Sequence, residues 1–459
     1  MRTVATFLGV LVLSTACGGG SAATPAPAAN VTVTFPNLFD QGGTKVLPTY
    51  ISHVITSQKY PLASITVQNT GGSDATMQVS IDLPTYGSPQ SQTLSLGAGQ
   101  GQTLTLSPVI SYTQLFSLTT AVPAALNVGV TVGGTSLFQQ SYPIEISGRD
   151  TVFWSNGSQP TTGLIATMVT PVDKAGAIAT LVRDAAPLIP GGMVLGYQLG
   201  SWPATAYALG PGQWQNESFV LLQGESPTVV IDSVVLTTGG APDTSFSVFI
   251  IDDANYQAWS AGSTTATACA VNNAPSAGAT LTCTTPPTGT YHIVYYNPST
   301  NTLSRTVTRH RPMTEWEVTY YQTQAIFQQL RAQGMVYVNL PGTGFFSSSQ
   351  NVKYPSESLA LLSANCIEGS LVFASAWEAM GMEPLLAVDF THGHAFTAVR
   401  CWSGSTSCVI PVETTMVGGT ATFADAVNTA STNWAGWAST LQTLDIKAAR
   451  ALGLTPAPM

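Results

Sequence analysis

Residues 361–370 read Leu-Leu-Ser-Ala-Asn-Cys-Ile-Glu-Gly-Ser, and at this stretch a loop-like composition gives way to an apolar one. Ser363 or Asn365 can cap a helix that runs to about Met380. Cys366 then lies in the first helical turn, where backbone N–H groups have no partner within the helix. The stretch therefore predicts a helix that carries a thiol at its N-terminus.

Two further polar residues follow this helix on predicted strands. His394 opens a strand at 395–400, and Glu413 ends the next strand, at 409–413. A helix N-terminus and a protonated imidazole both favour thiolate over thiol. A carboxylate orients the imidazole and stabilises its charged form. We therefore expect Cys366, His394 and Glu413 to meet as nucleophile, base and orienting acid.

The six cysteines of the chain support a special role for Cys366. Four of them flank two turn-like loops, and we expect them to form the disulfides Cys269–Cys283 and Cys401–Cys408, which an oxidising compartment permits. With Cys17 assigned to the N-terminal signal described below, Cys366 has no partner. A nucleophile accounts for an unpaired thiol in an exported protein. The alternative is a buried free thiol that serves as a small core side chain.

The N-terminal residues are typical of an export signal. Arg2 precedes an apolar stretch at 4–13, which is too short for a permanent membrane span, and small residues follow. We interpret residues 1–16 as a signal peptide. Cys17 and the three glycines after it resemble a bacterial lipoprotein cleavage site, which implies a lipid on Cys17; ordinary cleavage nearby and secretion is the alternative. Residues 17–30 then form a flexible tether.

The charge of the chain and the spacing of its histidines argue against a nucleic-acid partner and against a metal. Of the 459 residues only 8% are charged, and the net charge of −9 is spread without a basic patch, so we expect no nucleic-acid partner. His392 and His394 share a strand face, but Asp389 is the only close third ligand, so we expect no metal and no other cofactor.

Strand and helix patterns divide the rest of the chain. Alternating apolar residues between turn signals predict an immunoglobulin-like β-sandwich at 31–148 and a jelly-roll-like β-sandwich at 213–308. Helical periodicity at 151–210 and 310–459 suggests one discontinuous catalytic domain with the second sandwich inserted. The predicted fold class is multidomain, with α+β and all-β parts.

Three motifs in this order resemble the transglutaminase-like superfamily of papain-like cysteine enzymes, in particular its exported bacterial branch. They are Asn365-Cys366, Gly393-His394-Ala395-Phe396 and Pro411-Val412-Glu413-Thr414-Thr415. The resemblance covers about residues 310–430 and implies a core in which the helix bearing the cysteine packs on antiparallel strands. It also implies attack on an amide, through a thioester, in a peptide or protein substrate. Hydrolysis and acyl transfer both remain open.

The chain departs from this family pattern at two positions. Glu413 stands where many members have Asp, and no residue is an evident oxyanion donor beside the Cys366 N–H. We select Gln198 for that role, with Tyr197 and Asn339 as the alternatives. The competing function is an inactive transglutaminase-like surface lipoprotein that binds or adheres through its two sandwiches.

Overall fold

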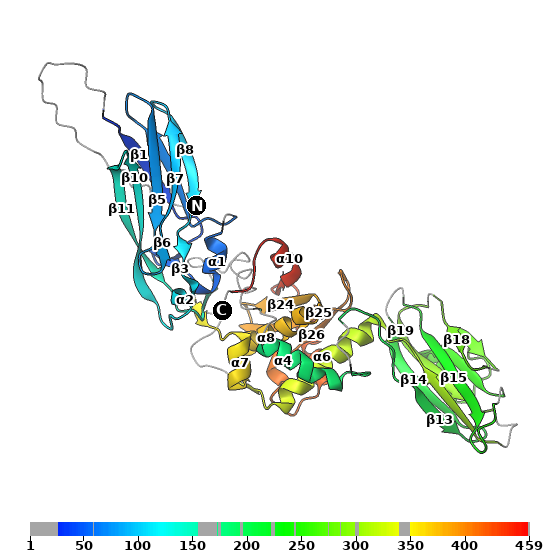
Figure 1. The fold of residues 1–459 in the computed structure, drawn as a ribbon. Coiled ribbons are helices and arrows are strands. Elements are labelled where there is room, and N and C mark those ends of the chain that lie inside the picture. Colours follow the sequence, from blue (N-terminus) through cyan, green and yellow to red (C-terminus); the bar gives the residue numbers. More distant parts are fainter. Residues whose placement is uncertain are drawn as a thin grey trace, which may run out of the picture.

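The computed structural model describes residues 26–57, 59–154, 172, 176–192, 196–221, 225–242, 245–273, 275–284, 286–298, 303–338 and 349–457. The chain forms a two-sheet β part at one end, a central part of helices around a four-stranded sheet, and a second two-sheet β part at the other end (Figure 1). The predicted combination of α+β and all-β parts in one multidomain chain is confirmed.

The N-terminal β part contains a three-stranded and a six-stranded sheet that share one core. The first sheet has the order β1 (Ala29–Thr34), β4 (Ala63–Asn69), β8 (Gly101–Leu106); the second has the order β2 (Phe39–Gln41), β3 (Thr44–Leu47), β11 (Thr135–Ile146), β10 (Val122–Val132), β5 (Ala75–Asp82), β7 (Gln90–Leu96). Because β1 already starts at Ala29, the predicted tether 17–30 is too long at its C-terminal end.

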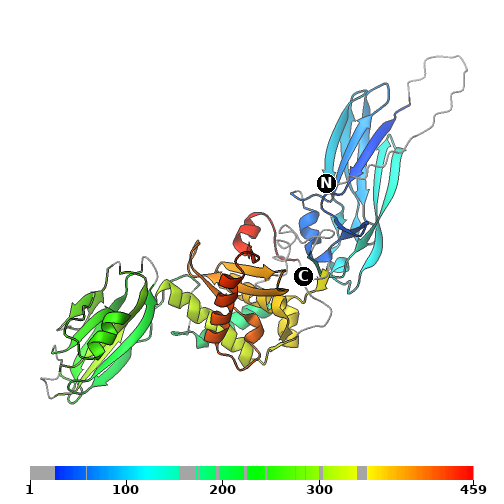
Figure 2. The same ribbon diagram turned by 180° about the vertical axis from the view of Figure 1, so that it is seen from behind.

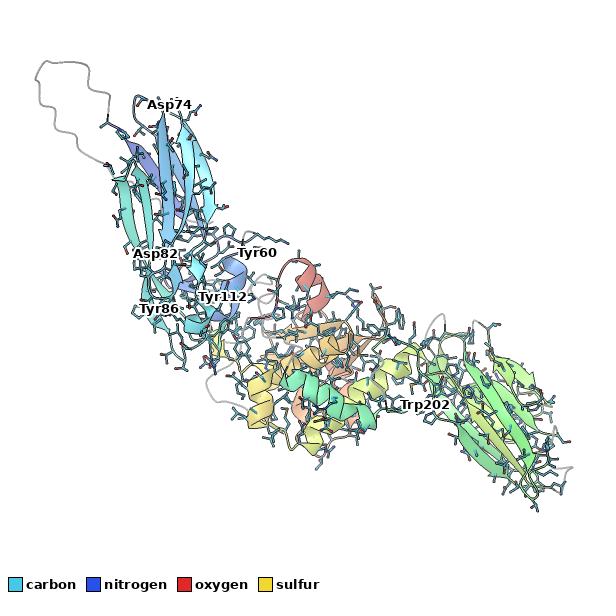
Figure 3. The ribbon with its side chains drawn as sticks, in the orientation of Figure 1. Tyr60, Asp74, Asp82, Tyr86, Tyr112 and Trp202 are labelled. Atoms are coloured by element: carbon cyan, nitrogen blue, oxygen red, sulfur yellow. A yellow bond between two sulfur atoms is a disulfide. The ribbon has the colours of Figure 1, made fainter. Side chains whose placement is uncertain are left out.

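Short elements close the end of this part that faces the central part. They are η1 (Thr49–Ile51), α1 (Ser52–Ile55), α2 (Tyr112–Leu115) and the two-stranded pair β6 (Gly87–Ser88) and β9 (Val109–Ile110). Figure 3 shows Tyr60 and Tyr112 at this end. The C-terminal segment reaches it, since Lys59 Nζ and the Tyr60 hydroxyl both donate to the carbonyl of Leu452, over 2.7 and 3.1 Å.

The second β part likewise contains two sheets, and each of them has four strands. One has the order β13 (Thr205–Leu209), β20 (Arg305–His310), β15 (Thr228–Leu236), β18 (Ala279–Thr282); the other has the order β14 (Trp214–Leu221), β19 (Gly289–Tyr296), β16 (Ser247–Asp252), β17 (Ala270–Asn272). Helix α5 (Asp253–Ser260) follows β16. Since β13 pairs with β20, this part begins at Thr205, inside the segment 151–210 that the sequence assigned to the catalytic domain.

The central part is built around an antiparallel sheet of order β26 (Val409–Val412), β25 (His394–Arg400), β24 (Pro384–Asp389), β27 (Gln442–Asp445). Helix α8 (Cys366–Ala379) covers one face, where Leu371 packs with Leu386 and Ala395. Helix α9 (Phe423–Gly436) covers the other face, where Ala430 packs on Phe396 (Figure 2, orange-red). Alternation along the strands supplies both faces with apolar side chains.

Further helices surround α8. They are α4 (Ala177–Ala185), η3 (Ala186–Leu188), α6 (Glu315–Ala332), α7 (Pro355–Leu361), η4 (Thr414–Met416) and α10 (Ile446–Ala451). Two short strand pairs complete the part: β12 (Thr151–Phe153) with β22 (Ser349–Asn351), and β21 (Val336–Tyr337) with β23 (Ser363–Ala364). Helix α8 is nearly apolar on all sides, which suits a helix buried between a sheet and other helices.

Segments from both sides of the second β part share one core. Ile178 and Leu181 of α4 pack in the same cluster as Ile326 and Leu330 of α6 and Phe373 of α8. Helix α4 begins after Gly176. Residues 155–171 and 173–175 of the predicted catalytic segment lie outside the described residues.

The chain enters and leaves the second β part at neighbouring positions. Trp202 lies between α6 and the second β part (Figure 3). Its N–H donates to the carbonyl of Arg311 over 2.8 Å, and its ring packs edge-on against Tyr321 of α6. Arg311 is buried and bonds both carboxylate oxygens of Glu317, over 2.7 and 2.6 Å. A bidentate buried ion pair therefore fixes this junction to α6.

Both expected disulfides are present. Cys269 pairs with Cys283 and Cys401 with Cys408, and Cys366 is the free cysteine of the described chain. Disulfides of this kind are typical of proteins outside the cytoplasm. The predicted signal peptide 1–16 and Cys17 lie outside the described residues. Within the described ranges, no helix has the length and apolar character needed to cross a membrane.

Candidate active site

Cys366 occupies the first residue of α8, as the capping signal predicts. The Asn365 side chain accepts from the Glu368 N–H over 3.0 Å, and the Glu368 carboxylate accepts from the Asn365 N–H over 2.9 Å. Glu368 is buried and also pairs with Lys353 over 2.8 Å, so its role is structural. Neither capping bond uses the N–H of Cys366, which stays available as a donor at the helix start.

The first turn of α8 lies against the segment that follows β26. The Thr414 hydroxyl donates to the carbonyl of Cys366 over 3.3 Å, and the Ser370 hydroxyl donates to the same carbonyl over 2.7 Å. Gly369 permits this approach, because a Cβ there would come within 2.8 Å of Thr414 Oγ1. This close packing fixes the first turn of α8 against the segment that follows Glu413.

His394 and Glu413 lie on adjacent antiparallel strands and touch. His394 is the first residue of β25, and Glu413 directly follows β26. Nε2 of His394 lies 2.8 Å from Oε2 of Glu413, and the other carboxylate oxygen accepts from the Thr415 hydroxyl over 2.7 Å. Glu413 is almost fully buried, and each of its carboxylate oxygens has a hydrogen-bond partner. The imidazole of His394 therefore has a fixed orientation.

The thiol of Cys366 is the second partner of His394. Burial by itself lowers the pKa of His394, but hydrogen bonds and charge interactions with Cys366 and Glu413 raise it to about 10. Since Glu413 occupies Nε2, Nδ1 is the nitrogen that remains for the sulfur. The imidazole therefore keeps its proton near neutral pH, which is the form that stabilises a thiolate. The His394 side chain is 22% exposed and Cys366 only 8%.

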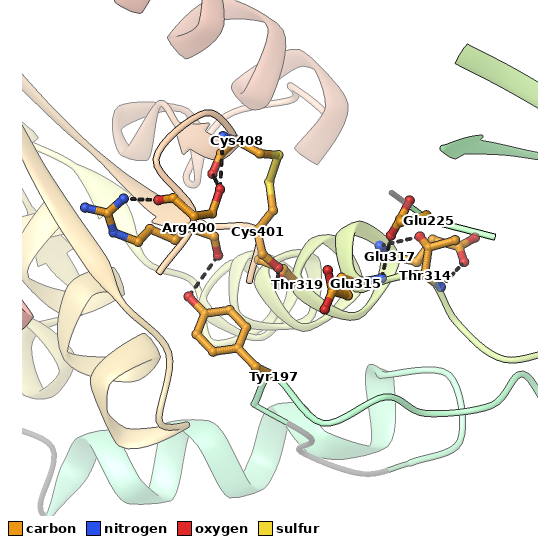
Figure 4. The surroundings of a disulfide bond; sticks show 10 residues. Tyr197, Glu225, Thr314, Glu315, Glu317, Thr319, Arg400, Cys401 and Cys408 are labelled. Carbon is orange, nitrogen blue, oxygen red and sulfur yellow. Dashed lines mark hydrogen bonds between the residues drawn. A yellow bond between two sulfur atoms is a disulfide. The ribbon is translucent and has the colours of Figure 1, made fainter. Parts of the chain in front are cut away.

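The expected oxyanion donor Gln198 does not lie at this site. Its neighbour Tyr197 donates to the carbonyl of Arg400 over 2.9 Å (Figure 4), at the end of β25 opposite to His394. Gly196 lies against the carbonyl of Met380, at the C-terminal end of α8. Six strand residues span about 20 Å, so the choice of Gln198 is wrong, and Tyr197 is excluded for the same reason. Asn339 lies outside the described residues.

Tyr337 is the site residue that the sequence did not indicate. It pairs with Ala364 in the short parallel ladder of β21 and β23, one strand away from the start of α8. Burial raises the pKa of its hydroxyl, and the nearby charges of Cys366 and Glu413 raise it further. The hydroxyl therefore stays protonated and can act as a hydrogen-bond donor. Tyr337 is 42% exposed, so it lies on the solvent side of the site.

Trp437, at the C-terminal end of α9, borders the site. Trp437 lies edge-on to His394, with ring centroids 5.9 Å apart, and stacks face to face on His392. The two histidines do not form a metal site with Asp389: in the part of the chain that the structure describes, no group of three or more His, Cys, Asp or Glu side chains is suited to a metal ion.

Comparisons with known proteins give no family for this chain. No protein-family model and no curated protein matches it. A secreted serine protease from Vibrio cholerae aligns over 53% of this chain and 45% of its own, with 11% identity and a TM-score of 0.15. Tripeptidyl peptidase 2 aligns over 62% and 20%, with 9% identity and a TM-score of 0.18. An exo-chitosanase from Amycolatopsis orientalis aligns over 51% and 22%, with 14% identity and a TM-score of 0.15. The chain thus spans less than half the length of these proteins, and scores this low indicate neither a shared fold nor a shared activity.

Proposed function

We propose that this chain is a transglutaminase-like cysteine enzyme that acts on amide bonds of a peptide or protein through Cys366, His394 and Glu413. The observation that carries the proposal is the position of His394, which interacts with the thiol on one side and with the buried Glu413 on the other. An imidazole held between a sulfur and a carboxylate is the arrangement that activates a cysteine nucleophile.

The reaction follows from these positions. The Cys366 sulfur attacks the amide carbonyl carbon as its proton passes to His394. The N–H of Cys366 and the hydroxyl of Tyr337 donate to the resulting oxyanion. The C–N bond then breaks, His394 gives its proton to the leaving amine, and a thioester remains on Cys366. Water or a second amine attacks the thioester while His394 takes its proton, so the product is a carboxylate or a new amide.

The same proposal places the enzyme in the cell envelope. The two disulfides support a location outside the cytoplasm. The N-terminal sequence supports attachment to a bacterial membrane through a lipid on Cys17. The two β parts, as immunoglobulin-like and jelly-roll-like modules, would flank the catalytic part and hold it against an extended substrate.

A trapping experiment distinguishes this enzyme from an inactive binding protein. The full chain is incubated with a library of peptide amides and hydroxylamine, which converts a thioester to a hydroxamate. We expect hydroxamates with the wild type, and none with Cys366→Ser or His394→Gln. Equal hydroxamate yields from wild type and Cys366→Ser would rule out catalysis at this site. Total absence of hydroxamate, together with a Cys366 thiol no faster than free cysteine towards iodoacetamide, would favour the binding protein.

A further inference from the structure

His392 lies beside the proposed active site with its imidazole ring held in place. Its Nδ1 is 3.1 Å from Oδ1 of Asp389, and its backbone N–H donates to the same oxygen over 2.9 Å. Asp389 is fully buried, and its other oxygen accepts from the Thr440 hydroxyl. Burial alone would raise the pKa of Asp389, but the hydrogen bonds from Thr440 and His392 bring it below its ordinary value. A buried carboxylate thus anchors one edge of the ring.

Trp437 fixes the face of the same ring and joins it to the catalytic histidine. The centroids of the His392 and Trp437 rings are 4.5 Å apart and the ring planes differ by 12°. Trp437 also lies edge-on to His394, at 5.9 Å, so the two imidazole centroids are at most about 10 Å apart. The His392 side chain remains 43% exposed. Its Nε2 edge is therefore the part that a bound molecule can reach.

The turn between β24 and β25 does not require the side-chain contacts of His392. The bond from the His392 backbone N–H to Asp389 already closes that turn, and any residue supplies a backbone N–H. The neighbouring carboxylates are occupied: Glu413 by His394 and Thr415, and Glu368 by Lys353. Since Nδ1 faces Asp389, an Nε2–H exists only on the protonated ring. That ring offers an incoming anion a charged donor, and of the described carboxylates named above only the buried Asp389 contacts it.

We infer that His392 binds a carboxylate of the substrate, about two to three residues of extended chain from the amide that Cys366 attacks. The inference rests on the proposed function and adds a substrate class to it: peptides with a free carboxyl group near the scissile bond. Trp437 acts as the positioning residue that holds His392 and His394 at a fixed separation.

The test uses two maleimides that differ only in charge, 3-maleimidopropionic acid and its carboxamide. Both alkylate thiols without turnover, and the acid carries its carboxylate on a two-carbon arm. The full chain is treated with each maleimide at the same slightly acidic pH, and the modified Cys366 peptide is quantified by mass spectrometry. We expect the ratio of acid rate to carboxamide rate to fall about fivefold in His392→Gln, the size of one partly exposed charge contact.

Two variants provide the controls. His310→Gln removes another imidazole that pairs with an aspartate, Asp232, but in the second β part, and it should leave the ratio unchanged. His392→Lys keeps a cation at the site and should keep most of the ratio. An unchanged carboxamide rate in His392→Gln shows that the thiol site itself is intact.

The two ways of failing are distinguishable. If Cys366 reacts rapidly with the carboxamide and the ratio is the same in wild type and His392→Gln, His392 does not bind carboxylates while the proposed function stands. If Cys366 reacts with neither maleimide faster than free cysteine does, the proposed function and this inference are both wrong.

Discussion

Gly369 and Thr414 are in direct contact, and their contact sets the distance between the helix that carries the thiol and the strand end that carries Glu413. A Cβ on residue 369 would lie 2.8 Å from Thr414 Oγ1 and 3.1 Å from its Cβ. The first of these distances is shorter than real Cβ contacts allow. The geometry of the candidate site therefore depends on a glycine whose contribution is steric.

Gly369→Ala should slow the alkylation of Cys366 and destabilise the protein. Alanine favours a helix by about 1 kcal/mol over glycine. Overpacking against Thr414 costs about 1–3 kcal/mol and moves the first turn of α8 away from Glu413. Iodoacetamide kinetics and urea unfolding measure both effects. Gly436→Ala, in α9 with open space around the position, should be neutral or stabilising. Wild-type reactivity in Gly369→Ala would show that the contact does not position the thiol.

Glu413→Gln should lower the pKa of His394. The carboxylate hydrogen bond and charge contribute to the value of about 10, and the amide keeps at most the hydrogen bond. Because the folded-state pKa lies above the ordinary histidine value, the wild-type ring stays protonated through neutral pH and loses its proton only as the pH rises towards 10. In the variant this loss occurs at lower pH. Imidazole NMR shifts followed over a pH titration report both curves. Glu378→Gln, which breaks an ion pair with Arg450 at the other end of α8, should leave the curve in place.

Tyr337→Phe should impair acyl transfer but not thiol alkylation. Removing one oxyanion donor typically lowers the rate by about 100-fold or more, whereas alkylation by iodoacetamide forms no tetrahedral oxyanion. Hydroxamate yield and alkylation rate are measured on the same preparation. Tyr142→Phe, in the N-terminal β part, serves as the control. An equal fall in both rates would mean that Tyr337 supports the fold of the site and is not a donor.

Replacing both Cys401 and Cys408 with Ser should lower the free energy of unfolding by about 2–3 kcal/mol, the loop-entropy value for so short a closed loop. The hairpin holds one end of β25, and the carbonyl of Cys401 accepts from Thr319 of α6 (Figure 4). His394 is at the opposite end of β25, so the alkylation rate of Cys366 should change little below the unfolding transition. A large loss of reactivity in the folded variant would contradict that separation.

Local patterns predicted the elements that carry the three site residues. The Asn365 capping signal and the apolar run after it match α8, and the strands expected at 395–400 and 409–413 match β25 and β26. These elements are nearly fully buried, so their sequences carry a strong signal. The two disulfides were predictable because each pair flanks a short loop.

The prediction of Gln198 failed, and Tyr337 was missed, because the positions of these residues depend on contacts between distant segments. Gln198 follows Tyr197, whose hydroxyl reaches a carbonyl about 200 positions away in sequence, and no local pattern reveals that pairing. Tyr337 lies in a two-residue strand with a parallel partner at 363–364, too short to give any periodicity. Its one usable signal is its place just after the end of α6, close in sequence to the motif that contains Cys366.

The chain enters the second β part at Trp202 and leaves it at Arg311, and a backbone hydrogen bond joins these two residues. The chain therefore departs from the central part and returns to it at almost the same point, so the second β part can be exchanged without interrupting the core beneath. The Arg311–Glu317 pair keeps whatever is inserted there aligned with α6. A chain with a different module at this point would keep the core that positions Cys366, His394 and Glu413.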